Sequence, residues 1–226
     1  MLSITPPAPA VTRSLHVREL RRTTAERVIG PYALSLHSGE CVVVSGPSGV
    51  GKSLLLRMIA DLDPNQGELS ITTSTVGTPM TTHARAAMSA PAWRKQVTYV
   101  AAESGWWADT LSDHLHIASH AQALTLLASL GLASDLMQAP IARLSSGERQ
   151  RCALLRAIVQ QPHFLLLDEP SSALDGDSAL RLEAVLHSLK NNGTGLLVVS
   201  HNAAQISRIA DRVLYMSSTA LLESPA

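Results

Sequence analysis

Residues 46–53 read GPSGVGKS, a glycine-rich run that ends in a lysine and a serine. This run matches the phosphate-loop pattern GxxxxGK[ST], in which backbone N–H groups turn toward a polyphosphate. The lysine then reaches the β and γ phosphates, and the serine hydroxyl ligates Mg²⁺. An ordinary glycine-rich turn is the competing interpretation. The candidate nucleotide-binding residues are Gly46, Pro47, Ser48, Gly49, Val50, Gly51, Lys52, Ser53 and Leu54, with Lys52 also catalytic and Ser53 also a metal ligand.

Two adjacent carboxylates, Asp168 and Glu169, follow an apolar run at residues 164–167. We expect that run to be a buried strand, and ligands of open parallel sheets bind beyond the carboxyl ends of the strands. Asp168 would hold Mg²⁺ through water, and Glu169 would orient and deprotonate the attacking water. The other interpretation is that both acids only decorate a helix N-terminus. Together with the phosphate loop, the pair predicts phosphoryl transfer to water.

Alternating strand and helix patterns are expected to position these groups. A β-branched apolar stretch at residues 41–45 precedes the glycine-rich loop, and leucines and isoleucines recur at helical spacing over residues 52–62. Buried strands are predicted at residues 164–167 and 195–200, each followed by a helical pattern. Such alternation implies a mainly parallel sheet.

The remaining segments predict two further layers. Residues 15–20 and 27–36 look like antiparallel strands, while residues 72–92 are rich in Thr, Ala, Ser and Pro and are expected to be a linker. Residues 111–161 read as mostly helical. The predicted fold class is therefore α/β: a P-loop NTPase with a mainly parallel central sheet, an N-terminal antiparallel β layer and an α-helical subdomain.

Composition narrows the classes of function. The chain has 226 residues, of which 46% are hydrophobic and only 16% charged, against about 25% charged in a typical domain, so a partner could cover apolar surface. Eighteen basic residues balance eighteen acidic ones without like-charge blocks, so the charge pattern does not support a nucleic-acid partner and we expect none. Cys41 and Cys152 lack metal-ligand neighbours and are expected to be reduced core thiols.

No apolar run reaches the 18 or so residues that span a bilayer, so we expect a cytoplasmic chain that does not cross a membrane. Residues 1–12 hold three prolines and no positive charge, which is unlike a secretion signal. We expect residues 1–13 to be a flexible leader.

Three further segments carry a resemblance to a known family. Residues 144–148, LSSGE, resemble the signature motif of ATP-binding cassette (ABC) proteins, usually written LSGGQ. Residues 168–170 and 171–175 resemble the family's Walker B motif and D-loop, and Ser200-His201 resembles its switch histidine. The order and spacing fit from roughly Ser14 to Met216. The resemblance implies an ABC nucleotide-binding domain at residues 14–226, with its helical subdomain at about 104–161.

The family implies an ATPase subunit that binds ATP and Mg²⁺ and energises a separate integral-membrane permease. ATP would lie between the phosphate loop of one subunit and the signature segment of another, in a homodimer or paired cassette. Ser145 and Gly147 would then contact the γ-phosphate across the interface, and Asp175 of the D-loop would also belong to the nucleotide-binding residues. Glu169 and His201 would be catalytic with Lys52. The subunit would be peripheral on the inner face of the cell membrane.

Several positions depart from the family pattern. Ala102 stands where a Mg²⁺-contacting Gln is usual, so Glu103 is either a substitute metal ligand or a solvated loop residue. The aromatic that stacks on adenine is missing from residues 20–23, where an Arg plane could replace it. Leu54 and Ser146 replace a hydroxyl residue and a signature glycine. We expect intact phosphate machinery with altered adenine and permease-sensing contacts.

Trp106 and Trp107 fall in the segment that faces the permease in this family. They are predicted to line a docking groove, with core packing as the alternative. A regulatory module and a non-transport ABC ATPase remain alternative functions. Repair members carry a coiled-coil insertion and translation factors two cassettes, whereas here 93 residues separate Lys52 from Ser145. Compact length and residues 94–115 also look similar to small bacterial iron-export-type cassettes.

Overall fold

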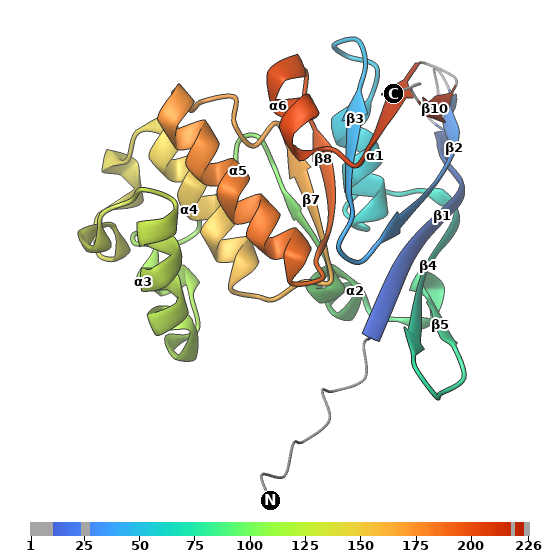
Figure 1. Ribbon diagram of the computed structural model, residues 1–226, viewed down its shortest axis with the longest axis horizontal. Coiled ribbons are helices and arrows are strands. Elements are labelled where there is room, and N and C mark those ends of the chain that lie inside the picture. Colours follow the sequence, from blue (N-terminus) through green and yellow to red (C-terminus); the bar gives the residue numbers. More distant parts are fainter. Residues whose placement is uncertain (1–10, 24–27, 218–219, 224–226) are drawn as a thin grey trace, which may run out of the picture.

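The computed structural model describes residues 11–23, 28–217 and 220–223. Its centre is a six-stranded sheet in the order β10-β9-β3-β8-β7-β6 (Figure 1). Neighbouring strands are parallel throughout, except that β10 is antiparallel to β9. The expected mainly parallel sheet is confirmed. Its strands are β3 (Cys41–Ser45), β6 (Val97–Val100), β7 (Phe164–Asp168), β8 (Gly195–Val199), β9 (Arg212–Met216) and β10 (Leu221–Glu223).

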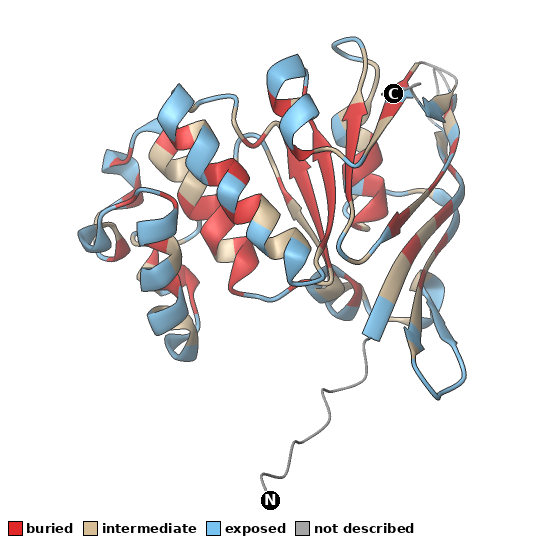
Figure 2. Cartoon of the chain, in the orientation of Figure 1, coloured by how far each residue is buried: buried red, intermediate tan, exposed pale blue. Residues whose placement is uncertain are grey.

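Helices cover both faces of this sheet, which explains why β7 and β8 are buried along their whole length (Figure 2). Alternate residues of each strand point to opposite faces. Leu165 and Leu167 pack against α4 (Ser146–Ile158) and α5 (Gly176–Asn191). Leu166 packs in a second core with α1 (Lys52–Ile59) and α2 (Ala90–Gln96). Strand, loop and helix thus follow one another as the sequence predicted.

A separate antiparallel sheet in the order β2-β1-β4-β5 contributes to the second core. Its inward residues alternate along β1, where Leu15 and Val17 are buried between more exposed neighbours. The predicted N-terminal β layer is therefore confirmed. Its strands are β1 (Val11–Thr23), β2 (Val28–His37), β4 (Gln66–Thr75) and β5 (Thr81–Ala84).

The linker expected at residues 72–92 is wrong, because this stretch contains the end of β4, all of β5, the 3₁₀ turn η1 (Arg85–Ala87) and the start of α2. Every residue of β5 is exposed, so no apolar alternation marks the strand. The start of α2 is set by Ser89, whose hydroxyl accepts a hydrogen bond from the Ala92 N–H, and by a proline in the first turn. Only one residue of this helix, Trp93, is buried.

Strand β1 also begins earlier than expected. Val11 to Arg13 pair with β4 instead of belonging to a leader of residues 1–13, and residues 1–10 lie outside the described part of the chain. Residues 111–161 are helical mainly in α3 (His120–Ser129) and α4, with four short 3₁₀ turns between and before them. These turns are η2 (Ser112–His114), η3 (Ile117–Ser119), η4 (Ser134–Met137) and η5 (Ile141–Arg143), and α6 (Ala203–Ile209) follows β8. Within the described residues, no helix is both long and apolar enough to span a bilayer.

Candidate nucleotide-binding site

The glycine-rich loop joins β3 to α1 at the carboxyl edge of the parallel sheet. Gly46 has φ of 142° and lies so close to β9 that a Cβ there would be 2.3 Å from the Met216 carbonyl oxygen, so only glycine fits. Gly51 caps α1 in a left-handed conformation, without a side chain bonded to the first-turn N–H groups. Those N–H groups and the helix dipole can therefore bind an anion.

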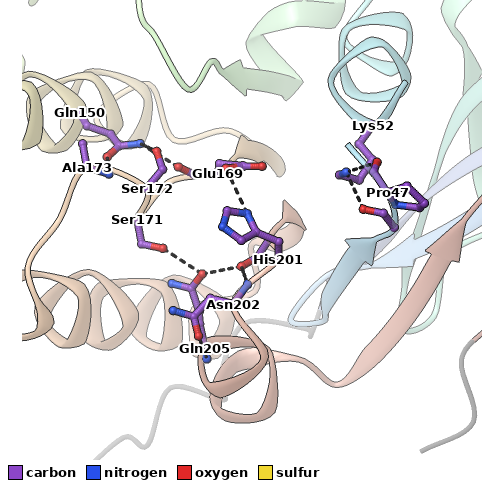
Figure 3. A network of polar contacts seen from close by, with 12 residues as sticks. Pro47, Lys52, Gln150, Glu169, Ser171, Ser172, Ala173, His201, Asn202 and Gln205 are labelled. Atoms are coloured by element: carbon purple, nitrogen blue, oxygen red, sulfur yellow. Dashed lines mark hydrogen bonds and ion pairs between the residues drawn. The ribbon is translucent and has the colours of Figure 1, made fainter. Parts of the chain in front are cut away.

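Lys52 lies folded over this loop. Its Nζ donates hydrogen bonds of 2.8 Å to the carbonyl oxygens of both Gly46 and Pro47 (Figure 3). A lysine ammonium has three donors, so one is left to point at a phosphate oxygen. The fixed position of the positive charge fits the phosphate-binding role predicted for Lys52.

Asp168 ends β7, and its side chain is held by a residue that the sequence analysis did not identify. The hydroxyl of Tyr99, on β6, donates a hydrogen bond of 3.0 Å to Asp168 Oδ2. Burial, followed by the charge and hydrogen bond of Asp168, raises the pKa of Tyr99 well above its usual range, so the phenol stays protonated and keeps donating. One carboxylate oxygen of Asp168 is thereby oriented and the other is left for a metal or its water.

Glu169, the next residue, has φ of 46°, a left-handed conformation that strains a residue with a side chain by about 1–3 kcal/mol. Its backbone N–H donates to Val199 O at 3.0 Å, which ties it to β8. Its Oε2 lies 3.3 Å from Nδ1 of His201, which follows β8. The structure thus brings together the predicted general base and the predicted switch histidine (Figure 3).

A buried polar network supports the residues next to this pair. Gln205 of α6 is only 1% exposed, and its Oε1 accepts hydrogen bonds from Ser171 at 3.0 Å and Ser200 at 2.9 Å. The Ser200 hydroxyl in turn accepts from the Asn202 N–H. These bonds connect the segment that follows Glu169, at Ser171, with the residue that precedes His201, Ser200. Gln205 could not be identified from the sequence, because nothing in the local sequence marks it as functional.

The signature segment begins α4. Ser145 is the N-cap: its hydroxyl accepts from the Glu148 N–H at 3.2 Å, while Glu148 Oε2 accepts from the Ser145 N–H and hydroxyl at 2.8 Å. These bonds lower the pKa of Glu148. Ser145 and Ser146 are exposed, so the N-terminus of α4 is presented to solvent. Asp175 similarly caps α5, accepting from the Ser178 N–H at 2.7 Å, and its role at a nucleotide stays a prediction.

The predicted metal ligands are Ser53, Asp168 and Glu103, and the structure gives them different surroundings. Among the described residues, no three His, Cys, Asp or Glu side chains cluster closely enough to hold a metal ion by themselves. Mg²⁺ in nucleotide sites is usually held by one or two protein oxygens together with phosphates and water, which Ser53 and Asp168 can supply. Glu103 lines a cavity of about 440 Å³ with Trp106, Arg149 and other residues near α4, so its proposed metal role stays a prediction.

The predicted substitutes for an adenine-stacking aromatic have other partners. Arg21 Nε donates to Gln66 Oε1 at 3.1 Å, and Arg22 forms a 3.1 Å ion pair with Asp63. Stacking of either guanidinium on a base would have to be compatible with these bonds. Residues 24–27, which follow them, lie outside the described part of the chain.

The arrangement as a whole defines a class of protein. A phosphate-binding loop opens α1, and a carboxylate pair ends the buried strand β7 of a mainly parallel sheet. Asp168, the predicted metal ligand, is held by Tyr99, and Glu169, the predicted base, lies beside His201. Together these parts fit a P-loop nucleoside triphosphatase.

Comparisons with known proteins give the family. A family model described as ABC transporter matches residues 29–172. Two relatives from strains of Pseudomonas fluorescens, aliphatic sulfonates import ATP-binding proteins SsuB 2 and SsuB, are 35% and 36% identical over 206 and 212 residues. Each match covers 88% of this chain and 72% of the relative. A solved ATP-binding subunit of an ABC transporter shares the fold, with a TM-score of 0.78 at 22% identity over 93% of this chain and 89% of that one.

This chain belongs to the ABC transporter family, as an ATP-binding subunit that hydrolyses ATP with Mg²⁺. Subunits of this kind work with membrane permease subunits. When bound, Mg²⁺ would neutralise charge on the phosphates. The residues predicted for the site would supply a cradle for the phosphates, an oriented carboxylate for the metal, and a base for the water.

Proposed function

We propose that two copies of this nucleotide-binding domain close around ATP, each placing its signature segment on the phosphates bound by the other. The observation that carries this proposal is the exposed, capped N-terminus of α4. The Glu148 N–H is taken by the Ser145 hydroxyl, so the donors for an anion at this end would be the N–H groups of Ser146, which is exposed, and of Gly147, which is a buried residue. Light scattering with ATP and EDTA would then give twice the 24.0 kDa mass of one chain. A mass that stays at one chain would contradict the dimer.

The surface proposed for the permease is a groove of about 450 Å³ between α2, β6 and α4. Trp107 lines it and is 74% exposed, whereas Trp106 is partly buried and packs against the helical core. The two indoles therefore have different positions: Trp106 contributes to core packing, and Trp107 is available to a partner. An exposed Trp in a preformed groove is typical of an interface anchor.

The loop that carries Trp107 is held in place before any partner binds. The Arg156 guanidinium lies 4.4 Å and 4.6 Å from the ring centres of Trp106 and Trp107, and it donates to the Gly105 carbonyl at 3.0 Å. Buried His114 accepts the backbone N–H groups of Trp107 and Ala108 and packs edge-on against both indoles. A preordered surface loses less entropy on binding.

The groove is also electropositive. Its charged lining residues are Arg94, Lys95 and Arg156, and none of the described residues that line it is acidic. We therefore propose that it binds an acidic cytoplasmic segment of the permease, which would place the subunit on the inner face of the membrane. The relatives are named for import of aliphatic sulfonates, but the transported molecule would contact the permease and so does not follow from this groove.

Replacing Trp107 with alanine should weaken binding of the permease by about 30-fold, because a central aromatic anchor contributes about 2 kcal/mol or more. The permease that copurifies from membranes would be reconstituted in nanodiscs, and binding measured by interferometry. Ile117→Ala is the matched control, since Ile117 is 78% exposed but does not line the groove. Unchanged affinity, or a loss of folding in Trp107→Ala, would contradict docking at this residue.

Replacing Tyr99 with phenylalanine should raise the Mg²⁺ concentration for half-maximal ATPase activity by about tenfold. A hydrogen bond to a charged group is worth about 1.5–3 kcal/mol, and its loss frees the Asp168 side chain to rotate. ATP affinity in EDTA, measured by calorimetry, should not change. Thr98→Val is the control: it removes a hydroxyl from the same strand, and among the described residues that hydroxyl bonds to the Arg94 carbonyl alone. An equal loss of ATP affinity with and without Mg²⁺ would argue against a metal-specific role.

A further inference from the structure

Gln150, in the second turn of α4, contacts the segment that contains the predicted general base. It is 6% exposed, and its Nε2 donates hydrogen bonds to the Glu169 carbonyl at 2.8 Å and to Ser172 Oγ at 3.3 Å. Its Oε1 accepts the Ala173 N–H at 3.3 Å. All three bonds run from the signature helix to residues 169–173 (Figure 3). A fully used amide in a buried position fixes the two segments relative to each other.

The bond to the Glu169 carbonyl acts on a strained residue. Glu169 has its backbone in the left-handed region, which a residue with a side chain keeps only where its surroundings hold it there. The Glu169 N–H is held by Val199 of β8, and the carbonyl accepts from Gln150 of α4 at 2.8 Å and from the Ser172 N–H at 3.2 Å. Of these bonds, the one from Gln150 is the link to the signature helix, and the direction of the Glu169 side chain, and so its approach to His201, depends on all three.

A second contact joins the same two segments one turn earlier. A Cβ at Gly147 would lie 2.9 Å from the Ala173 carbonyl oxygen and 3.3 Å from Leu174 Cδ2, so the start of α4 packs directly on the backbone of the loop after β7. Gly147 and Gln150 are three residues apart and lie on one face of the helix. The N-terminus of α4 and residues 169–174 are therefore joined at two adjacent levels.

We propose that Gln150 is a positioning residue that holds Glu169 in its working conformation and transmits the position of the signature segment to it. In the dimer proposed above, that segment contacts the ATP bound by the partner subunit, while Glu169 acts on the ATP bound by its own. Gln150 then makes hydrolysis at one site respond to closure at the other. The transmission rests on the proposed dimer, whereas the positioning of Glu169 does not.

The test is a double-mutant cycle in the full-length chain. Gln150→Met keeps the length and packing of the side chain but removes its hydrogen bonds. It should lower kcat by about 10- to 100-fold, because a small displacement of a catalytic group has effects of this size. The ATP concentration for half-maximal rate should change little. In a Glu169→Gln background, the same substitution should not lower the residual rate further. Gln122→Met, on the exposed face of α3, is the control and should leave kcat unchanged.

A second variant and two measurements separate the outcomes. Gln150→Glu at pH 8 can still accept the Ala173 N–H but cannot donate to Glu169, so it should be as slow as Gln150→Met. Normal kcat in Gln150→Glu, or additive losses in the cycle, would overturn the positioning role. Thermal midpoints close to that of the parent exclude general unfolding. Light scattering with ATP and EDTA tests the dimer separately, so a chain that dimerises but shows additive losses refutes this inference alone.

Discussion

Exchanging Glu169 for glutamine is expected to lower kcat for ATP hydrolysis by about 10²- to 10⁴-fold, the usual contribution of a general base. The amide keeps the size of the side chain but cannot accept a proton from water. ATP affinity should change little, because Lys52 and the first turn of α1 are separate from Glu169. A single-turnover assay with radiolabelled ATP would measure the chemical step, and calorimetry would measure binding.

The geometry supports this size of effect. Glu169 is partly exposed and lies 3.3 Å from His201, so its carboxylate can reach water while its direction is set by a neighbour. Glu68→Gln is a suitable control because Glu68 is an exposed residue of β4, in the antiparallel sheet. If Glu169→Gln retained most of the activity, the base would have to be another group. The variant should also stay dimeric in MgATP for longer than the parent because it consumes ATP more slowly, which the dimer proposal requires.

The sequence predicted those parts of the site that are formed by residues next to each other in the chain. The phosphate loop requires glycine at set positions, and Gly46 confirms this by its contact with Met216. The carboxylate pair could be placed because a run of four buried apolar residues precedes it. The signature segment was found only through family resemblance, since a capping box alone is common to many helices.

Contacts between distant residues were not predictable in the same way. Tyr99 and Asp168 are 69 residues apart, and they meet because β6 and β7 are parallel neighbours that end at one edge of the sheet. Gln150 did leave a signal: it is a polar residue on the buried stripe of α4 that includes Gly147 and Leu154. A polar residue in such a stripe must find partners, but the sequence does not say which.

The linker predicted at residues 72–92 failed for a related reason. Apolar periodicity reports burial, so strands with few buried residues show little of it. In β4 only Leu69 and Ile71 are buried, and β5 has no buried residue. A composition rich in Thr, Ser and Pro predicts irregular structure, but threonine is β-branched and therefore also favours strands. The β4–β5 hairpin is therefore clear in the structure but leaves almost no pattern of apolar residues in the sequence.

Replacing Lys52 with methionine is expected to have the largest effect of all, because it removes a positive charge that contributes both to ATP binding and to the hydrolysis step. Hydrogen bonds from a charged group are worth about 1.5–3 kcal/mol, which corresponds to about 10- to 150-fold in ATP affinity. Loss of a cation that stabilises the transferring phosphoryl group lowers kcat by a further 10²-fold or so. The combined loss in kcat/KM is therefore about 10³-fold or more.

This expectation can be separated from a simple loss of folding. Lys52 also bonds the carbonyl oxygens of Gly46 and Pro47, so its removal loosens the loop. Methionine keeps most of the length of the side chain, however, and α1 remains packed through Leu55 and Ile59. The midpoint temperature of thermal unfolding should change by only a few degrees. Lys190→Met is the matched control, since it removes a lysine that lies outside the phosphate loop and pairs with Asp211 at 2.9 Å. Near-normal ATP affinity in Lys52→Met would mean that the loop and the dipole of α1 hold the phosphates without this charge.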